Sequence, residues 1–183
     1  GKHKMKLTDE QIELGTKLMR MAYAFQIGYI GNPCVYYGDE ALMEGYRDPF
    51  NRRTYPWDKL KDYQAEQVKF VQEISKLRAD NPVLRTGFYK TLFASEYSIV
   101  FERFLDVNSN DYFGRSISQG SKRVVLLINN NSVKKIRFST VTSSVELVDS
   151  EEECASKYIV SVDGDAEQVI EVAPMSFTFV LFN

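Results

Sequence analysis

The chain has few of the residues that mark several functional classes. Its 183 residues include one histidine, His3, and two cysteines, Cys34 and Cys154. A single histidine close to the terminus argues against a Ser-His-Asp triad and against a histidine-rich metal site, since terminal segments are usually poorly ordered. Two distant cysteines without Cys-x-x-Cys spacing indicate neither a zinc site nor a disulfide framework. The sequence therefore predicts no cofactor and no metal site in this chain.

Charge and hydropathy exclude two classes of partner. The net charge is -2 and there is no basic patch, which argues against nucleic acid. No apolar run approaches the roughly 18–20 residues of a membrane helix, so no membrane partner is expected. No signal peptide is visible, and both a cytoplasmic and a secreted location stay open. With 44% hydrophobic and 26% charged residues, the chain is typical of one globular domain, or of one domain with part of another.

The first part of the chain predicts helix, strand, loop and helix. Thr8-Asp9-Glu10-Gln11 is a capping-box signature, and it predicts a helix from there to residues 26–29 with a wide apolar arc. The apolar run 33–37 is typical of a short buried strand, with Cys34 as a small core residue. A second helix is predicted over residues 60–79, before Asn81-Pro82.

From about residue 84 the hydrophobic period changes to two, which is the period of strands. The predicted strands are 88–94, 97–105, 123–129, 135–140, 144–148, 158–162, 168–172 and 176–182. Many short strands separated by turns indicate an antiparallel sandwich. The polar segment 106–119 is expected to be a long hairpin tip. The predicted fold class is therefore α+β.

Residues 31–45 read Gly-Asn-Pro-Cys-Val-Tyr-Tyr-Gly-Asp-Glu-Ala-Leu-Met-Glu-Gly, and Asp48-Pro49, Arg52-Arg53 and Pro56-Trp57-Asp58 follow. This motif resembles the last barrel strand and the following loop of the α-amylase superfamily (glycoside hydrolase family 13). Within it, the motif is most similar to the neopullulanase, cyclomaltodextrinase and maltogenic amylase group. Residues 70–86, 124–131 and 170–175 resemble, more weakly, that family's final helix and its C-terminal sandwich, domain C. The resemblance implies that residues 1–82 are the C-terminal end of a (β/α)8 barrel and that residues 83–183 are a Greek-key β-sandwich.

The resemblance also implies that Asp48 and Arg52, four residues apart, bind a sugar of the substrate. An internal ion pair would produce the same spacing, and both interpretations stay open. Trp57 is a candidate for stacking on a sugar ring, with packing as the alternative. For Asp39 and Glu40 the alternatives are an acid/base pair or carboxylates that fix the loop. Adjacent residues of an extended chain point to opposite faces, which favours the second. Arg53 is expected to anchor the loop.

A C-terminal fragment of a retaining α-glucan hydrolase, acting on starch, pullulan or cyclodextrin, is the function that the resemblance implies. The catalytic carboxylates of that family come from earlier barrel strands, and no matching motif occurs here. We therefore expect no catalytic residue in the chain, and no activity of the chain alone. Whether the parent enzyme needs calcium stays open. The implied partners are an α-glucan oligosaccharide, through the parent enzyme, and the missing barrel portion of the same polypeptide.

The alternative is a non-catalytic sandwich domain that binds carbohydrate or has a structural role. A single barrel strand would lack parallel neighbours, so its edges would be exposed. We therefore expect either that the two helices fold back on the sandwich or that copies of the chain self-associate.

Overall fold

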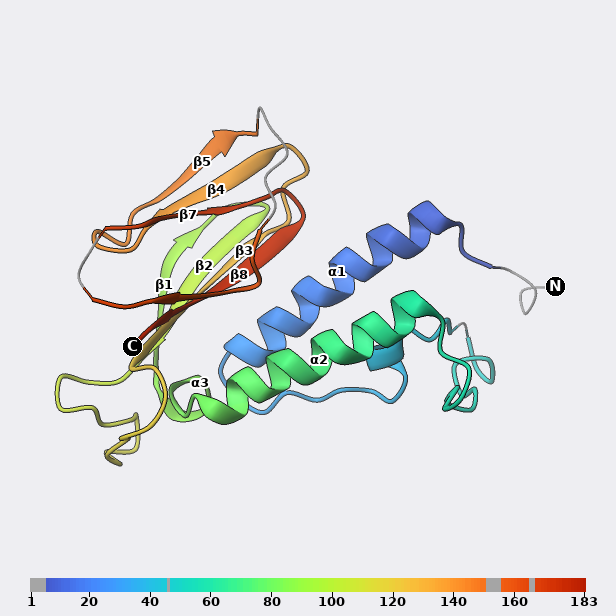
Figure 1. Ribbon diagram of the computed structural model, residues 1–183, viewed down its shortest axis with the longest axis horizontal. Coiled ribbons are helices and arrows are strands. Elements are labelled where there is room, and N and C mark those ends of the chain that lie inside the picture. Colours follow the sequence, from blue (N-terminus) through green and yellow to red (C-terminus); the bar gives the residue numbers. More distant parts are fainter. Residues whose placement is uncertain (1–5, 46, 151–155, 165–166) are drawn as a thin grey trace.

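The structure, a computed structural model, describes residues 6–45, 47–150, 156–164 and 167–183; His3 and Cys154 lie outside these ranges. The helices are α1 (Asp9–Gly28), the 3-10 turn η2 (Asp39–Ala41), α2 (Asp62–Asp80) and α3 (Val83–Thr86) (Figure 1). The strands are β1 (Phe88–Ala94), β2 (Ser98–Phe104), β3 (Arg123–Asn129), β4 (Lys134–Ser139), β5 (Val145–Asp149), β6 (Ile159–Val162), β7 (Val169–Val172) and β8 (Ser176–Phe182). This confirms the mixed α+β class. Within the described ranges, no helix has the length and apolar character that a membrane crossing requires.

The strands form two sheets, of order β1-β2-β3-β8-β6 and β5-β4-β7. All eight predicted strands are present, each with bounds within one residue of the prediction. Neighbouring strands are antiparallel except β6 and β8, which are parallel. The prediction of a wholly antiparallel sandwich is wrong for this pair, because the chain crosses over from β5 in the smaller sheet before it enters beside β8.

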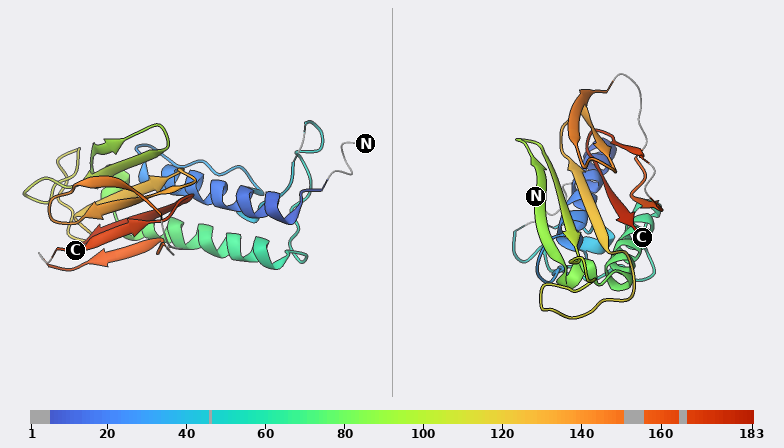
Figure 2. Two further views of the ribbon diagram at one scale, coloured as in Figure 1. Left: turned by 90° about the horizontal axis from the view of Figure 1, so that it is seen from above. Right: turned by 90° about the vertical axis from the view of Figure 1, so that its left-hand side faces the viewer.

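The larger sheet is covered on both faces, so the molecule has three layers (Figure 2). Val125 and Leu127 of β3 face the smaller sheet, where they pack with residues such as Phe138. The alternate residues of β3, including Leu126, face α1 and α2. Ile27 of α1 belongs to the same cluster. The expectation that the two helices fold back on the sandwich is therefore confirmed.

The start and the end of α1 follow from local sequence. Thr8 Oγ1 accepts a hydrogen bond from the Gln11 N–H (3.3 Å), and Gln11 Oε1 accepts one from the Thr8 N–H (3.0 Å). The predicted capping box is thus confirmed. At the other end, a Cβ on Gly28 would lie 2.7 Å from Leu126 Cδ2. A glycine is therefore needed for the last turn of α1 to pack this closely on β3.

Two buried arginines, Arg78 of α2 and Arg103 of β2, hold the end of α1 against the sandwich. They donate to the backbone carbonyls of Ile27, Gly28, Tyr29, Gly31, Leu84, Gly87 and Phe88. The carbonyl end of a helix carries partial negative charge, and α1 has no basic residue in its own last turn. Burial, and then the charge of Arg78, lower the pKa of Arg103 to about 10, so it stays protonated at neutral pH. These hydrogen bonds of Arg78 and Arg103, here called the joint, fix the direction in which the chain leaves α1.

The predicted buried strand at residues 33–37 is wrong: the segment has no strand structure and all five residues are exposed. Cys34 is correspondingly an exposed thiol rather than a core residue. A parallel strand needs hydrogen-bonded neighbours, and the described part of the chain supplies none beside this segment. The apolar composition of the run is that of a strand, but the residues described in the structure give it no strand partner.

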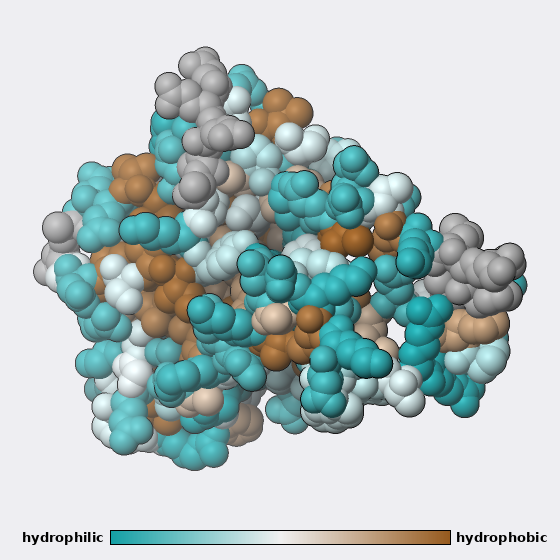
Figure 3. Space-filling model, turned by 45° about the vertical axis from the view of Figure 1, so that its right-hand side comes forward, coloured by the Kyte–Doolittle hydropathy of each residue, from teal (hydrophilic) through white to brown (hydrophobic). Residues whose placement is uncertain are grey.

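The exposed apolar side chains of this part of the molecule belong to the segment 33–37, to α1 and to the residues that flank α1. They are Leu7, Leu14, Leu18, Phe25, Tyr29, Ile30, Val35, Tyr36 and Tyr37. In Figure 3, hydrophobic residues reach the surface in several separate patches on the face shown. Phe25 and Tyr29 still contact the Phe101 ring of β2, whereas Leu14 and Leu18 are 50% and 43% exposed on α1.

Candidate functional site

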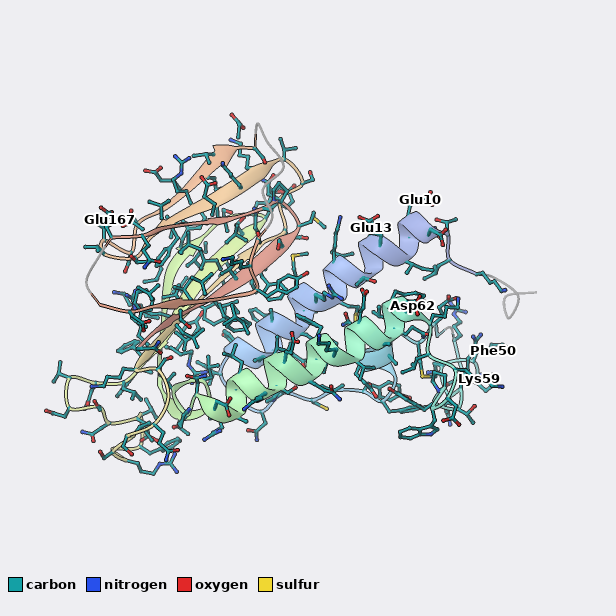
Figure 4. The ribbon with its side chains drawn as sticks, viewed as in Figure 1. Glu10, Glu13, Phe50, Lys59, Asp62 and Glu167 are labelled. Carbon is teal, nitrogen blue, oxygen red and sulfur yellow. The ribbon has the colours of Figure 1, made fainter. Side chains whose placement is uncertain are left out.

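The candidate site is the segment of residues 38–58, here called the site loop. It lies beside the N-terminal ends of α1 and α2, at the end of the molecule remote from the sandwich (Figure 1). In Figure 4, Phe50 and Lys59 lie at this end, close to Asp62 at the start of α2. Gly38 opens the loop with φ at 92°, and a Cβ there would lie 2.6 Å from Met43 Sδ. Only glycine fits this turn without strain.

Hydrogen bonds to Glu40 and Ala41 fix the first turn of the loop. Glu40 Oε2 accepts a hydrogen bond from the Gly38 N–H (2.8 Å), so the Glu40 carboxylate stabilises the turn that contains it. The Ala41 carbonyl accepts from Gln64 Nε2 of α2 (2.8 Å), and Ala41 is fully buried. This geometry supports the interpretation of Glu40 as a residue that fixes the loop.

The environment of Asp39 disfavours the ionised form of its carboxyl group. Burial, and then the charge of Glu40, raise its pKa. On α1, the buried Tyr23 hydroxyl has no hydrogen-bond partner among the described residues. Burial, followed by the charges of Asp39 and Glu40, raises the pKa of Tyr23. Asp39 also lines a cavity of about 170 Å³ together with Glu44. That volume is below the roughly 300–1,000 Å³ of typical ligand pockets, so this cavity alone does not make a substrate site.

Asp48 and Arg52 form a two-bonded ion pair. Arg52 Nε lies 3.1 Å from Asp48 Oδ1, and Arg52 Nη2 lies 3.0 Å from Asp48 Oδ2. The hydrogen bond from Arg52 lowers the pKa of Asp48, and the same bond raises the pKa of Arg52. Both side chains are mostly exposed, so the pair contributes little to stability and stays accessible to a ligand. The structure thus brings these two predicted residues together.

Trp57 is 80% exposed at the far end of the loop, and its ring centroid lies 4.6 Å from that of Tyr55. The Tyr37 hydroxyl donates to the Arg53 carbonyl (3.2 Å), so the contact of Arg53 with Tyr37 is made by its backbone. Tyr36 and Tyr37 are exposed, so the predicted burial of the run 33–37 is wrong for both rings. Among the described residues on and beside the site loop, the rings of Tyr36, Tyr37, Phe50 and Trp57 are therefore exposed and that of Tyr55 is partly exposed.

Comparison with known proteins identifies the family. No family model matches the chain. An amylopullulanase of Thermoanaerobacter thermohydrosulfuricus is 34% identical over 128 residues, which are 70% of this chain and 8% of that protein. A cyclomaltodextrinase of a Bacillus species is 40% identical over 80 residues, which are 44% of this chain and 14% of that protein. A solved cyclomaltodextrinase structure has 27% identity and a TM-score of 0.54, over 75% of this chain and 21% of that one.

The chain belongs to the α-amylase family, glycoside hydrolase family 13. This confirms the resemblance stated from residues 31–58, and the cyclomaltodextrinase group within it is among the relatives. The chain spans about a tenth of the length of the two curated relatives.

Among the described residues, no group of three or more His, Cys, Asp or Glu side chains is placed so that it could hold a metal ion. The feature that sequence reasoning missed is Tyr23, whose buried hydroxyl has no hydrogen-bond partner among the described residues and whose pKa is raised by burial and then by the charges of Asp39 and Glu40. No signal in the sequence marks it, because it stands among the apolar residues of an ordinary amphipathic helix.

Proposed function

We propose that the chain is the C-terminal part of a retaining α-glucan hydrolase. Residues 1–82 would be the end of its (β/α)8 barrel and residues 83–183 its domain C. The order of elements supports this division: a helix, an apolar run and a second helix precede the sandwich. The observation that carries the proposal is the apolar segment 33–37, which has the composition of a buried strand and is nevertheless exposed. In a complete barrel, parallel neighbours would pair with it on both sides and cover Tyr36 and Tyr37.

The site loop would then contribute to substrate binding and not to bond cleavage. The Asp48 carboxylate can accept hydrogen bonds from neighbouring sugar hydroxyls, while the Arg52 guanidinium donates in a fixed fork. Trp57, which is exposed beside Tyr55, offers a flat apolar surface to the C–H face of a glucose ring. A retaining glycosidase needs two carboxyl groups about 5–5.5 Å apart across the scissile bond. We assign that pair to the part of the barrel that the sequence before residue 1 would supply.

The substrates that this proposal names are α-glucans. Amylopullulanase and cyclomaltodextrinase are named for starch-type, pullulan and cyclodextrin substrates, and the ion pair of the site loop suits the hydroxyl-rich surface of all three. The Glu40 carboxylate accepts a hydrogen bond from the Gly38 N–H at the start of the site loop. This bond supports a structural role for Asp39-Glu40 in the proposed enzyme.

Two assays test the proposal. The first incubates the purified chain with maltoheptaose, pullulan and β-cyclodextrin, and no hydrolysis is expected. The second fuses the chain behind the preceding part of the Bacillus cyclomaltodextrinase, and activity is expected to return. Hydrolysis by the chain alone would contradict the proposal, and so would a folded chimera without activity.

Substitutions in the chimera test the binding roles. We expect Asp48→Asn, Arg52→Met and Trp57→Ala each to raise KM by about ten-fold, with a smaller change of kcat. Lys59→Met, at the same end of the molecule, is the control and should leave both constants unchanged. Wild-type KM in all three site-loop variants would contradict the assignment of this loop to substrate binding.

A further inference from the structure

A second group of exposed aromatic residues lies on the loop between β2 and β3, residues 106–119, here called the aromatic loop. Two aspartates organise it. Asp106 Oδ1 accepts from the N–H groups of Asn108 (2.9 Å) and Asn110 (2.7 Å). Asp111 Oδ1 accepts from the N–H groups of Phe113 and Arg115, each at 2.9 Å. The loop is thus built from two successive turns whose backbone donors are satisfied by its own carboxylates.

The second of these turns presents two aromatic rings at its corners. The Gly114 N–H donates to the Asp111 carbonyl (2.9 Å), and Gly114 has φ at 76°. Tyr112 and Phe113 are therefore the two central residues of the turn, positions that Gly, Pro, Asn, Asp and Ser usually occupy. They are 68% and 69% exposed. Large aromatic side chains stabilise a protein mainly by burial, so two of them on an exposed turn indicate a contact surface.

Neighbouring groups hold both rings in place. The Tyr112 N–H donates to the Thr86 carbonyl (3.0 Å). The ring centroids of Tyr112 and Phe113 are 5.5 Å apart and the rings are perpendicular. The Arg115 guanidinium lies 5.1 Å from the Phe113 ring centroid and forms an ion pair with Asp111 (2.9 Å). A ligand would therefore meet side chains whose orientations are already fixed, which lowers the entropy lost on binding.

The two exposed rings continue a row of aromatic side chains that begins in the sheet. Phe104 of β2 stacks on Phe88 of β1 with centroids 5.5 Å apart, and Phe88 lies 5.7 Å from Tyr112. The row runs from half-buried to exposed rings. Apart from Val107 and Ile117, the other residues of the loop close in sequence to its exposed end are polar: Asn108, Ser109, Asn110, Arg115, Ser116 and Ser118. The rings thus form a narrow apolar strip on a mostly polar loop. Protein interfaces bury roughly 800 Å² per partner, far more than two side chains offer.

We propose that the aromatic loop is a second α-glucan binding site, separate from the site loop. The choice of ligand rests on the proposed function. A glucose unit has an apolar C–H face bordered by hydroxyls, which matches an aromatic strip bordered by polar groups. Tyr112 and Phe113 stack on sugar rings, while the Tyr112 hydroxyl and the Arg115 guanidinium donate to sugar hydroxyls.

The aromatic loop lies far from the site loop. Figures 1 and 2 show the aromatic loop at one end of the molecule, beside the sandwich, and the site loop at the opposite end. A ligand that reaches both must be a long polymer, so the aromatic loop would hold the parent enzyme on starch while a distant segment of the same glucan chain binds at the site loop.

Affinity electrophoresis of the intact 183-residue chain in gels with and without amylopectin tests this inference. We expect amylopectin to retard the wild-type chain, and Tyr112→Ala/Phe113→Ala to lower the association constant by about ten-fold or more. Tyr112→Trp/Phe113→Trp should keep the retardation because the flat surfaces remain. Tyr97→Ala, on the β1–β2 hairpin, is the matched control and should migrate as wild type. All substituted rings are exposed, so thermal unfolding should confirm that each variant is folded.

The outcomes separate this inference from the proposed function. No retardation of the wild-type chain, or equal retardation of the alanine double variant, would overturn the second site. Loss of retardation in Trp57→Ala but not in the alanine double variant would also overturn it, and would support the site loop. Loss in the alanine double variant alone supports the second site even if the chimera with cyclomaltodextrinase is inactive.

Discussion

The sandwich and the N-terminal part of the chain are both rich in apolar residues, but only the sandwich buries most of them. Val125 and Phe179 are completely buried between layers. Leu14 of α1 is 50% exposed and Ile30, just after α1, is 56% exposed. Every strand of the sandwich has a hydrogen-bonded neighbour, whereas residues 33–37 have none in the described structure. The comparison shows that an apolar segment takes its secondary structure from the partners it finds, as well as from its own pattern.

The joint between the two regions should be the most sensitive position. The Arg103 guanidinium donates to five backbone carbonyls, two of them at the end of α1. Arg78 still donates to two of the five, so Arg103→Met leaves the carbonyls of Gly28, Gly87 and Phe88 without the arginine donor. We expect the free energy of unfolding to fall by about 3–5 kcal/mol, measured by urea denaturation. Arg137→Met, which removes an exposed ion pair with Glu171, should cost less than about 1 kcal/mol. Equal effects would mean that the two regions do not depend on this joint.

Substitutions at two adjacent residues of β3 compare how firmly the two faces of the large sheet are packed. Leu126 packs under the helices and Leu127 packs against the smaller sheet. Each is buried, so Leu→Ala at either position should cost about 2–5 kcal/mol. Leu18→Ala, on the exposed face of α1, should cost less than about 0.5 kcal/mol. A cost at Leu126 as small as that at Leu18 would show that the helices are not firmly packed on the sandwich.

Acid should weaken the aromatic loop in a defined pH range. Burial of Asp111 opposes its ionisation, but hydrogen bonds from the Arg115 N–H, Thr86 and the Arg115 side chain lower its pKa to about 2. A carboxyl whose pKa is lower in the folded state stabilises the fold above its unfolded value near 3.8, and this contribution is lost as the pH falls toward 2. We expect the melting temperature of the wild-type chain to approach that of Asp111→Asn across this range. A constant difference between the two from pH 5 to pH 2 would contradict this explanation.

The smallest effect on stability is expected on the exposed side of α1. Leu14→Ser/Leu18→Ser should lower the free energy of unfolding by only about 0.5–1 kcal/mol, because both side chains are already near half-exposed and serine has only a slightly lower helix propensity than leucine. The same change should reduce self-association at high concentration, measured by light scattering. Glu13→Gln/Lys17→Gln on the same helix is the control. An unchanged association state in the serine variant would show that this face has no role in contacts between copies.

The sequence was sufficient for the elements whose determinants are local. The capping box at Thr8 and the alternation of β3 predicted their structures because the side chains that decide them lie within a few residues. The parallel pairing of β6 with β8 could not be predicted, since it depends on a crossover of the chain between the two sheets. At the site loop, the spacing of Asp48 and Arg52 predicted their contact. The exposure of Cys34 was missed because it depends on strands that would have to come from elsewhere.

The most direct test of the account is amide hydrogen exchange at residues 34–37, measured in this chain and in the chimera with the preceding part of the Bacillus cyclomaltodextrinase. If this segment is the last strand of a barrel, its amides exchange rapidly in the chain alone and become strongly protected in the chimera, while the amides of β3 are protected in both. Equally rapid exchange of residues 34–37 in a folded, active chimera would contradict the account.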